Sequence, residues 1–152
     1  MITVADAWAA IMADGQSAPG WHARRIASGS AADVQAAIRL PEQKPALLVI
    51  VPSRAVPAGT IHPECTGFSV FPQIVTPGGN GTVRLCLELR SDRYREVFDI
   101  LAQDVADVLS RIPDQEGIVR AFYGRLNTWQ RFVTRFGPEH LSEEAQAGLF
   151  AE

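Results

Sequence analysis

Residues 82–112 read TVRLCLELRSDRYREVFDILAQDVADVLSRI, and within this stretch the spacing of the hydrophobic side chains changes. Over 82–89 they occupy every second position, which is typical of a β-strand with one buried face. Over 93–111 they recur at 3.6-residue spacing with acidic and polar residues opposite, which predicts an amphipathic helix that ends before Pro113. The change of period indicates a fold that uses both a sheet and helices.

Four segments upstream of this stretch are also predicted to be strands. The run at 47–51 is continuously hydrophobic and is followed by Pro52, which predicts a strand buried on both faces, whereas 82–89 should be half exposed. Residues 34–40 could instead form a helix capped near Ser30, but the turn-like sequence PEQK that follows favours a strand. The upstream strands are 22–27, 34–40, 46–51 and 67–75.

The segment TPGGNG at 76–81 separates the last two predicted strands. Its glycines and asparagine supply the positive-φ positions that a hairpin loop requires. A glycine-rich loop can also hold a phosphate, but that use requires a following helix that begins with Lys and Ser or Thr, and no such helix follows. We therefore interpret the segment as a hairpin turn.

Helices are predicted at both ends of the chain. Residues 3–14 predict a short amphipathic helix, and residues 115–136 predict a second long one. Gly137-Pro138 then interrupts the chain, and Ser142 is a suitable N-cap for a last helix. The sequence thus predicts an α+β fold: an N-terminal helix, an antiparallel β-sheet of about four to five strands, two long amphipathic helices and a truncated C-terminal helix.

The composition of the 152 residues fits one globular domain, with 47% hydrophobic and 20% charged residues. The net charge of −3 gives no overall attraction to nucleic acids, although 13 of the 14 cationic residues are arginine, which pairs well with carboxylates and phosphates. A GC-rich coding bias is the simpler explanation of that preference. The N-terminus lacks the basic start of a secretory signal and no run is long enough to span a membrane, so we expect a cytoplasmic protein without membrane contact.

Few residues are spaced as catalytic groups. His22, His62 and His140 are isolated from one another, so we interpret them as surface or turn histidines. Cys65 and Cys86 match no metal-binding or redox spacing and are interpreted as free structural thiols. A nucleophilic pair of His62 and Cys65 is the alternative, but both lie in a proline-rich loop.

Arg120, Arg131 and Arg135 fall within about 60° of one another on the polar side of the helix at 115–136. Such a stripe can contact DNA phosphates, which makes these three the candidate DNA-binding residues. It can equally be a solvated face, because residues 84–135 contain nine arginines and eight acidic residues whose charges largely cancel. Arg125 lies at the edge of the apolar side and requires an acidic partner or access to water.

Glu152 falls on the same side of the predicted C-terminal helix as Ala145, Gly148 and Leu149. No glycine cap, cationic last turn or proline ends that helix, so we expect the chain to be a fragment of a longer protein. A carboxylate on an inward helix face needs a cation, a hydrogen-bond network or a metal, although at a chain end it can also extend into water.

A family pattern covers the last part of the chain. It begins with Trp129 and an aromatic residue three positions later, Phe132, and continues through a glycine-containing break and Leu-Ser to Gln146-x-Gly-Leu-Phe, ending at Glu152. In this pattern the chain resembles PD-(D/E)XK motif proteins of the restriction-endonuclease-like superfamily, which are often encoded among bacterial phage-defence genes. It departs at Ala151, where the family usually has glycine. Upstream the likeness is looser.

The resemblance implies the N-terminal region of a Mg²⁺-dependent DNA endonuclease from a prokaryotic phage-defence system. It divides the chain into an N-terminal α+β domain at 1–139 and the start of the nuclease core at 140–152. In that fold Glu152 would join an Asp and a Glu-x-Lys from later strands around Mg²⁺, as a ligand or beside one. The full-length protein would be the phosphodiester hydrolase, and residues 1–152 would not be catalytic by themselves. DNA is the expected partner, together with defence-system subunits, and a homo-oligomer fits the same interpretation.

Two other classes of function compete with this one. A protein-interaction or oligomerisation module without its own catalysis would dock through an exposed sheet face or through the side of Trp129, Phe132 and Phe136. A small-molecule-binding domain would require a specific polar cluster, which the sequence does not show.

Overall fold

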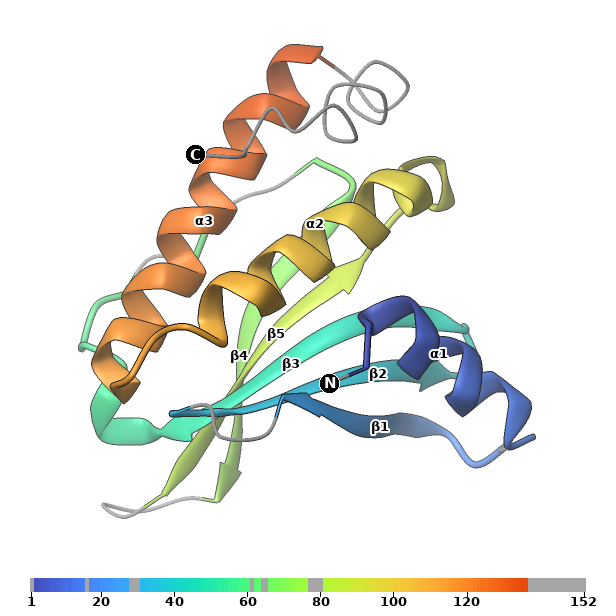
Figure 1. Cartoon of the computed structure of the whole chain (residues 1–152), viewed down its shortest axis with the longest axis horizontal. Coiled ribbons are helices and arrows are strands. Elements are labelled where there is room, and N and C mark those ends of the chain that lie inside the picture. The colour runs from blue at the N-terminus through green and yellow to red at the C-terminus, as the bar shows by residue number, and fades with distance from the viewer. Residues whose placement is uncertain are drawn as a thin grey trace.

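The computed structural model describes residues 2–15, 17–27, 31–60, 62–63, 66–76 and 81–136 (Figure 1). Its elements are α1 (Val4–Ala13), β1 (Gly20–Ala27), β2 (Asp33–Leu40), β3 (Lys44–Pro52), η1 (Ser53–Ala55), β4 (Phe68–Thr76), β5 (Thr82–Leu89), η2 (Asp92–Tyr94), α2 (Arg95–Leu109) and α3 (Gln115–Phe136). The α+β prediction is confirmed, and the ambiguous segment at 34–40 is a strand. The predicted last helix lies outside the described residues.

The five described strands form one antiparallel sheet in the order β1-β2-β3-β5-β4. The first three follow one another in chain order. The chain then passes to the far edge to form β4 and returns as β5 between β3 and β4, so the two most hydrophobic strands are neighbours. Leu47 of β3 lies opposite Leu87 of β5, which places hydrophobic side chains of both strands on the same face.

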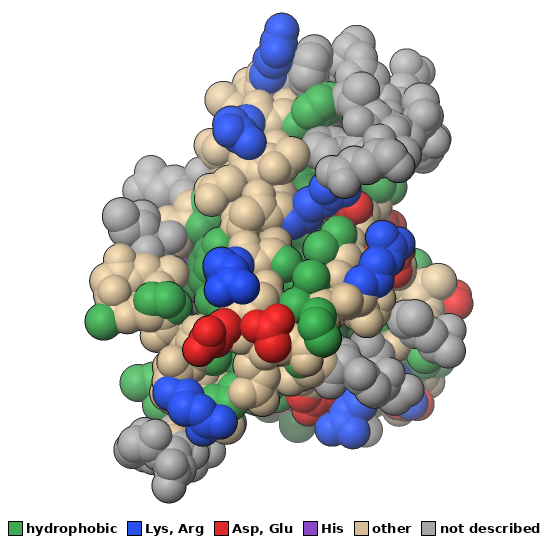
Figure 2. Space-filling model, turned by 60° about the vertical axis from the view of Figure 1, so that its left-hand side comes forward, with side chains coloured by type: hydrophobic (Ala, Val, Ile, Leu, Met, Phe, Trp, Pro, Cys, Tyr) green, Lys and Arg blue, Asp and Glu red, His purple; other side chains and the backbone are tan. Residues whose placement is uncertain are grey.

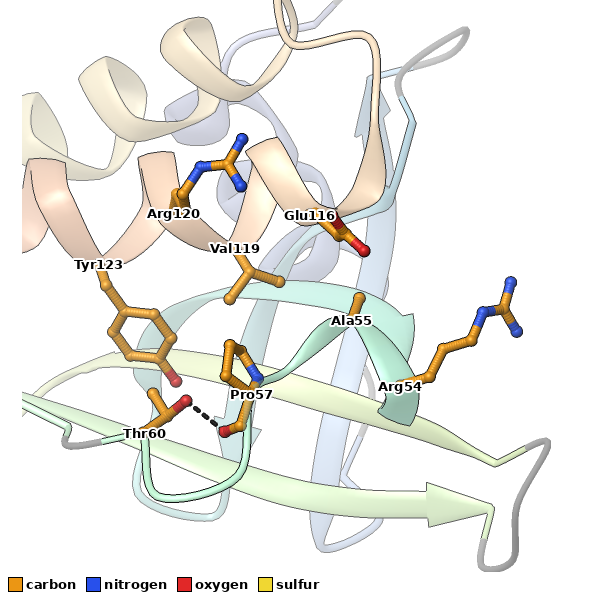
Figure 3. Close-up of a pocket in the computed structure, with 8 residues that line it drawn as sticks. All are labelled: Arg54, Ala55, Pro57, Thr60, Glu116, Val119, Arg120 and Tyr123. Carbon is orange, nitrogen blue, oxygen red and sulfur yellow. Dashed lines mark hydrogen bonds between the residues drawn. The ribbon is translucent and has the colours of Figure 1, made fainter.

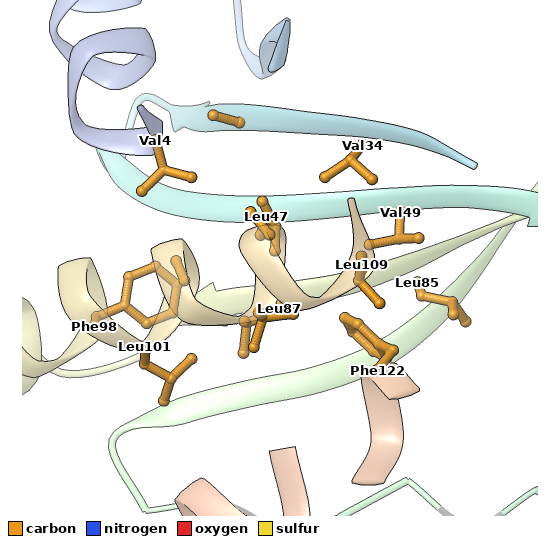
Figure 4. Packing of buried hydrophobic residues seen from close by; sticks show 14 of the residues in the cluster. Val4, Val34, Leu47, Val49, Leu85, Leu87, Phe98, Leu101, Leu109 and Phe122 are labelled. Carbon is orange, nitrogen blue, oxygen red and sulfur yellow. The ribbon is translucent and has the colours of Figure 1, made fainter. Parts of the chain in front are cut away.

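All described helices pack on one face of this sheet (Figure 1). α1 contacts β1 and β2, α2 contacts β3 and β5, and α3 packs against α2 and η1. Figure 4 shows the resulting core, which includes Val34, Leu47, Val49, Leu85, Leu87, Phe98, Leu101, Leu109 and Phe122. Burial of each large side chain contributes roughly 1.5–3 kcal/mol, so this layer is the main source of stability. None of the helices formed by the described residues has the length and apolar character that a membrane crossing requires.

The other face of the sheet is covered by no described helix, yet its centre is buried. The side chains buried there are Ala37, Ala46, Leu48 and Cys86, and Trp21 and Phe71 pack against them. The prediction that 82–89 is half exposed is therefore wrong at Cys86 and Glu88, which are 0% and 8% exposed. Side chains from neighbouring strands lie over these positions, a contact that the alternating pattern of one strand cannot reveal.

Candidate functional site

α3 carries the three predicted DNA-binding arginines. The packing of its apolar side determines the rotation of the helix about its own axis. Its N-terminus is capped by Asp114, whose Oδ2 accepts a hydrogen bond from the backbone N–H of Gly117 at 2.8 Å. The side that faces the sheet and α2 is at most 2% exposed and comprises Ile118, Phe122, Leu126, Trp129 and Val133. Since Trp129 is part of this core, it cannot serve as the centre of a docking surface, whereas Phe132 is only partly buried and the side chain of Phe136 lies outside the described residues.

Asp104 of α2 holds α3 in place. Its carboxylate accepts two hydrogen bonds from Arg125, from Nε at 2.6 Å and from Nη2 at 2.9 Å, and a third from Nε1 of Trp129 at 2.8 Å. The side chains of the ion pair are only 18% and 22% exposed, so water screens it weakly. Of the two alternatives expected for Arg125, an acidic partner or access to water, the structure shows the acidic partner. The contact also fixes the rotation of α3 and thereby the direction of its polar side.

The polar side of α3 presents Arg120, Arg131 and Arg135 to solvent. No Asp or Glu occurs on the helix after Glu116. Within the described part of the chain, Arg120 and Arg131 form no ion pair. The three arginines span about 22 Å along the axis at 1.5 Å per residue.

Most acidic residues whose charge would cancel that of the arginines lie away from α3, apart from Glu116, which is one turn before Arg120. Glu88 is on the opposite face of the sheet, and Asp104 is already bonded to Arg125. In Figure 2, which brings the side of α3 forward, the two uppermost Lys or Arg side chains have no acidic side chain beside them, whereas acidic side chains lie near the others. The local field along α3 is therefore more positive than the composition of 84–135 indicates.

A pocket of about 560 Å³ opens beside the first half of α3 (Figure 3). η1 and the loop after it form one wall, and α3 forms the other. The lining residues are Arg54, Ala55, Pro57, Thr60, Glu116, Val119, Arg120 and Tyr123. The lining is mainly apolar, and its charged groups are Arg54 and Arg120, which form no ion pair among the described residues, and the carboxylate of Glu116, so the cations exceed the anions by one. This combination suits a flat apolar group that carries negative charge, such as a nucleotide.

Tyr123, which lines this pocket, contacts His62 in the loop after η1. The Tyr123 hydroxyl lies 2.7 Å from Nδ1 of His62, and the two rings are 5.3 Å apart. Burial raises the pKa of Tyr123 to about 12, so the hydroxyl stays protonated at neutral pH and can donate to an unprotonated Nδ1. The pair fixes the loop against α3. No local pattern in the sequence indicates this contact, because the two residues are 61 positions apart.

His22 and Cys86 have the structural roles that the sequence predicted for them. His22 is exposed to an intermediate degree, and its Nε2 lies 2.7 Å from the carbonyl oxygen of Ala18. Cys86 is a free, buried thiol whose pKa is raised to about 12, mainly by desolvation, which makes it a poor nucleophile. His140 and Cys65 lie outside the described residues.

The predicted metal ligand Glu152 and the rest of 137–152 also lie outside the described residues, so that role stays a prediction. Within the described ranges, no three or more His, Cys, Asp or Glu side chains are grouped closely enough to hold a metal ion. The described carboxylates are engaged in caps, ion pairs and surface positions. They do not fit a Mg²⁺ site.

Two short segments match the letters of the family motif but have structural roles. Asp114, which follows a proline, is the cap of α3. Glu42-Gln43-Lys44, the only Glu-x-Lys in the sequence, forms the turn from β2 into β3. There Lys44 donates from Nζ to the backbone oxygen of Arg90 at 3.1 Å. These segments build the fold and do not assemble a catalytic motif.

Comparison with known protein families gives a match that covers nearly the whole chain. A family model described as "Putative PD-(D/E)XK family member" (DUF4420) matches residues 4–152. No curated protein and no solved structure matches the chain. The family resemblance drawn from the segment that begins at Trp129 is thereby confirmed.

Proposed function

We propose, from the premise that this chain belongs to the PD-(D/E)XK family, that it is the DNA-positioning N-terminal region of a Mg²⁺-dependent endonuclease of a prokaryotic phage-defence system. One observation carries the DNA-binding part of this proposal. Arg120, Arg131 and Arg135 share the solvent side of α3, and the helix has no acidic residue between them. These arginines give a protein of net negative charge a local surface that attracts phosphates.

The arrangement supports binding to the DNA backbone. At 3.4 Å per base pair, the span of about 22 Å covers roughly six base pairs, which allows the arginines to contact phosphates along one stretch of duplex. Arg120 also lines the pocket beside α3, where Arg54 adds a second cation. Contacts of this kind fix the position of DNA without reading its sequence.

Hydrolysis is assigned to groups outside the described residues, because the described carboxylates do not fit a metal site. In the proposed enzyme, Mg²⁺ would activate a water molecule and stabilise charge on the phosphate. Glu152 is proposed as one ligand of that ion or as a neighbour of a ligand. In a cleavage-competent form of the protein, Glu152→Gln should lower Mg²⁺-dependent cleavage roughly 10- to 100-fold, whereas Glu143→Gln should not. Equal activity of the two variants would remove Glu152 from the site.

The DNA-binding role is tested by removing two charges from α3. Arg131→Ala combined with Arg135→Ala should weaken binding to a labelled duplex in fluorescence anisotropy. The slope of log K against log salt concentration should also become shallower, by up to about 0.9 for each phosphate contact that is lost. Arg95→Ala combined with Arg111→Ala removes two exposed charges from the region of α2 and serves as the matched control.

Equal loss in both double variants would show only a response to net charge, and it would overturn the assignment to α3. Unchanged binding in the α3 variant would do the same. Melting temperatures of both variants should stay close to that of the unmodified protein, because all four side chains are exposed.

One observation favours a second function, an interaction or oligomerisation module of a multi-subunit defence complex. Ile74 and Val75, near the end of the edge strand β4, are 72% and 44% exposed. This function predicts self-association in light scattering that Ile74→Ser abolishes. A monomer at all concentrations, with no subunit bound, would count against it.

A further inference from the structure

The sheet face turned away from the helices carries aromatic and cationic side chains near its centre. Trp21 of β1, Arg39 of β2 and Phe71 of β4 belong to it, because their neighbours Ile38 and Val70 contribute to the core on the helix side. β1 and β4 are the two edges of the sheet. Side chains from opposite edges thus meet over its middle.

The geometry of this group is specific. Cζ of Arg39 lies 4.3 Å from the ring centre of Trp21 and 5.8 Å from that of Phe71. Both rings can approach so closely because the side chains beneath them are small, with Ala37 and Ala46 fully buried. The guanidinium is therefore held between two aromatic rings, at distances that permit cation–π attraction.

Glu88 anchors Arg39 from the other side. Nε of Arg39 lies 3.0 Å from Oε2 of Glu88, and the Glu88 side chain is 11% exposed. Arg39 thus reaches across β3, from β2 to β5. A cation that is paired and stacked in this way is fixed before any ligand arrives, which lowers the entropy cost of binding.

The charge of this face is positive, although the chain as a whole is acidic. Its cations are Arg25, Arg39, Lys44, Arg84 and Arg90, and its acids are Asp33 and Glu88, with Glu42 in the adjoining turn. Asp33 and Glu88 are each paired with an arginine of the same face. Lys44, Arg84 and Arg90 make no ion pair within the described residues, although Lys44 donates to the backbone oxygen of Arg90 and Arg84 to Oε1 of Gln73, so no described carboxylate pairs with these three positive charges.

A groove of about 630 Å³ at the edge of β4 extends this surface. Phe71, Ser69 and Arg90 line it, together with Pro63 of the preceding loop. An aromatic ring, a hydroxyl group and a guanidinium therefore meet in one concave site, which can receive a planar base and the phosphate attached to it.

We propose that this sheet face binds single-stranded nucleic acid, with bases on Trp21 and Phe71 and phosphates near Arg84 and Arg90. Stacking requires bases whose faces are free, which a duplex does not offer, and aromatic rings among cations are the usual means of binding single strands. The surface is separate from the arginines of α3, since the sheet lies between them. It therefore stands independently of the proposed duplex contacts.

Tryptophan fluorescence gives a direct test on the 152-residue protein with an oligo(dT) of about 15 nucleotides, the upper range of such sites. Trp8 and Trp129 are 7% and 1% exposed, whereas Trp21 is exposed to an intermediate degree, so stacked bases should quench mainly Trp21. Trp21→Phe should lose most of the quenching and keep most of the affinity in anisotropy.

Affinity measurements complete the test. Trp21→Ala and Phe71→Ala should each weaken oligo(dT) binding about tenfold, and Arg90→Ala should weaken it less and lower its salt dependence. Arg111→Ala is the control for net charge. Circular dichroism and thermal melting establish that each variant is folded.

Three results would overturn the proposal. The first is wild-type affinity for oligo(dT) in folded Trp21→Ala and Phe71→Ala variants. The second is absence of oligo(dT) binding by the unmodified protein. The third is concentration-dependent self-association that Phe71→Ala abolishes, which would make the face a protein interface. Failure of the α3 variant to affect duplex binding would count only against the proposed duplex contacts, so the two proposals are distinguishable.

Discussion

The two faces of the sheet are closed in different ways. The face beneath α1, α2 and α3 carries large hydrophobic side chains that the helices bury (Figure 4). The other face has a floor of mostly small side chains, over which Trp21, Arg39 and Phe71 lie. A layer of helices therefore seals one side, and side chains of the sheet itself seal the other. The second arrangement leaves polar and aromatic groups within reach of a ligand.

The largest expected effect comes from two adjacent leucines of β3. Leu47 faces the helices and Leu48 faces the aromatic rings, and they are 0% and 1% exposed. Leu47→Ala should lower the free energy of unfolding by about 3–5 kcal/mol, because the helix layer cannot fill the cavity. Leu48→Ala should cost about 2–3 kcal/mol, because Trp21 and Phe71 can move inward. Urea denaturation measures both.

Equal costs for the two leucine variants would show that the ring layer is as rigid as the helix layer. In that case the two faces would differ in the chemistry of their side chains, but not in how far those side chains can move to fill a cavity.

The next largest effect concerns the ion pairs on the two sides of the sheet, which should contribute differently to stability. Asp104→Ala removes the carboxylate that accepts three hydrogen bonds from Arg125 and Trp129 in a weakly hydrated site, so we expect the free energy of unfolding to fall by about 2–4 kcal/mol. Glu88→Ala should cost only about 1 kcal/mol, because Arg39 stays stacked and is 35% exposed. Urea denaturation of both variants shows which substitution lowers the free energy of unfolding more. A greater loss for Glu88→Ala would contradict our view that stacking holds Arg39 in place without Glu88.

The smallest effect concerns pH and the carboxyl of Asp99 on α2. Burial raises the pKa of Asp99, and the nearby Arg95 opposes this shift only in part. A raised pKa means that the folded state loses stability as pH rises from the ordinary aspartate pKa, about 3.9, through the folded value. Asp99→Asn should therefore raise the melting temperature slightly at pH 7, and the gain should disappear below about pH 4.

A gain of the same size at pH 3 and pH 7 would contradict the assignment to charge burial at Asp99. A matched measurement on Asp92→Asn, whose side chain is 90% exposed, should show little change at pH 7.

Much of the fold could be predicted from local patterns. The period of two in 82–89, the period of 3.6 in 93–111 and the turn before Lys44 identified the elements to within two residues. Such patterns record which side of an element is buried, and they act over a few residues. The order of the strands could not be predicted, because the insertion of β5 between β3 and β4 depends on pairing between distant segments.

The candidate sites divide in the same way. Helical periodicity placed Arg120, Arg131 and Arg135 on one side of α3 and indicated that Arg125 needs a partner. It could not name Asp104, which lies 21 residues away on another helix. Nor could it find the group formed by Trp21, Arg39 and Phe71, whose members come from three strands. The role proposed for Glu152 rests on the family pattern alone.

The sequence by itself determined the types and limits of the elements, the side of α3 that carries arginine, and membership of the PD-(D/E)XK family. Only the tertiary structure decided which charges remain available, because an ion pair forms between residues that the fold brings within a few ångströms of each other. It also decided that the uncovered face is sealed by aromatic rings around a cation. Backbone periodicity is a property of neighbours along the chain, whereas a binding surface is a property of neighbours in space.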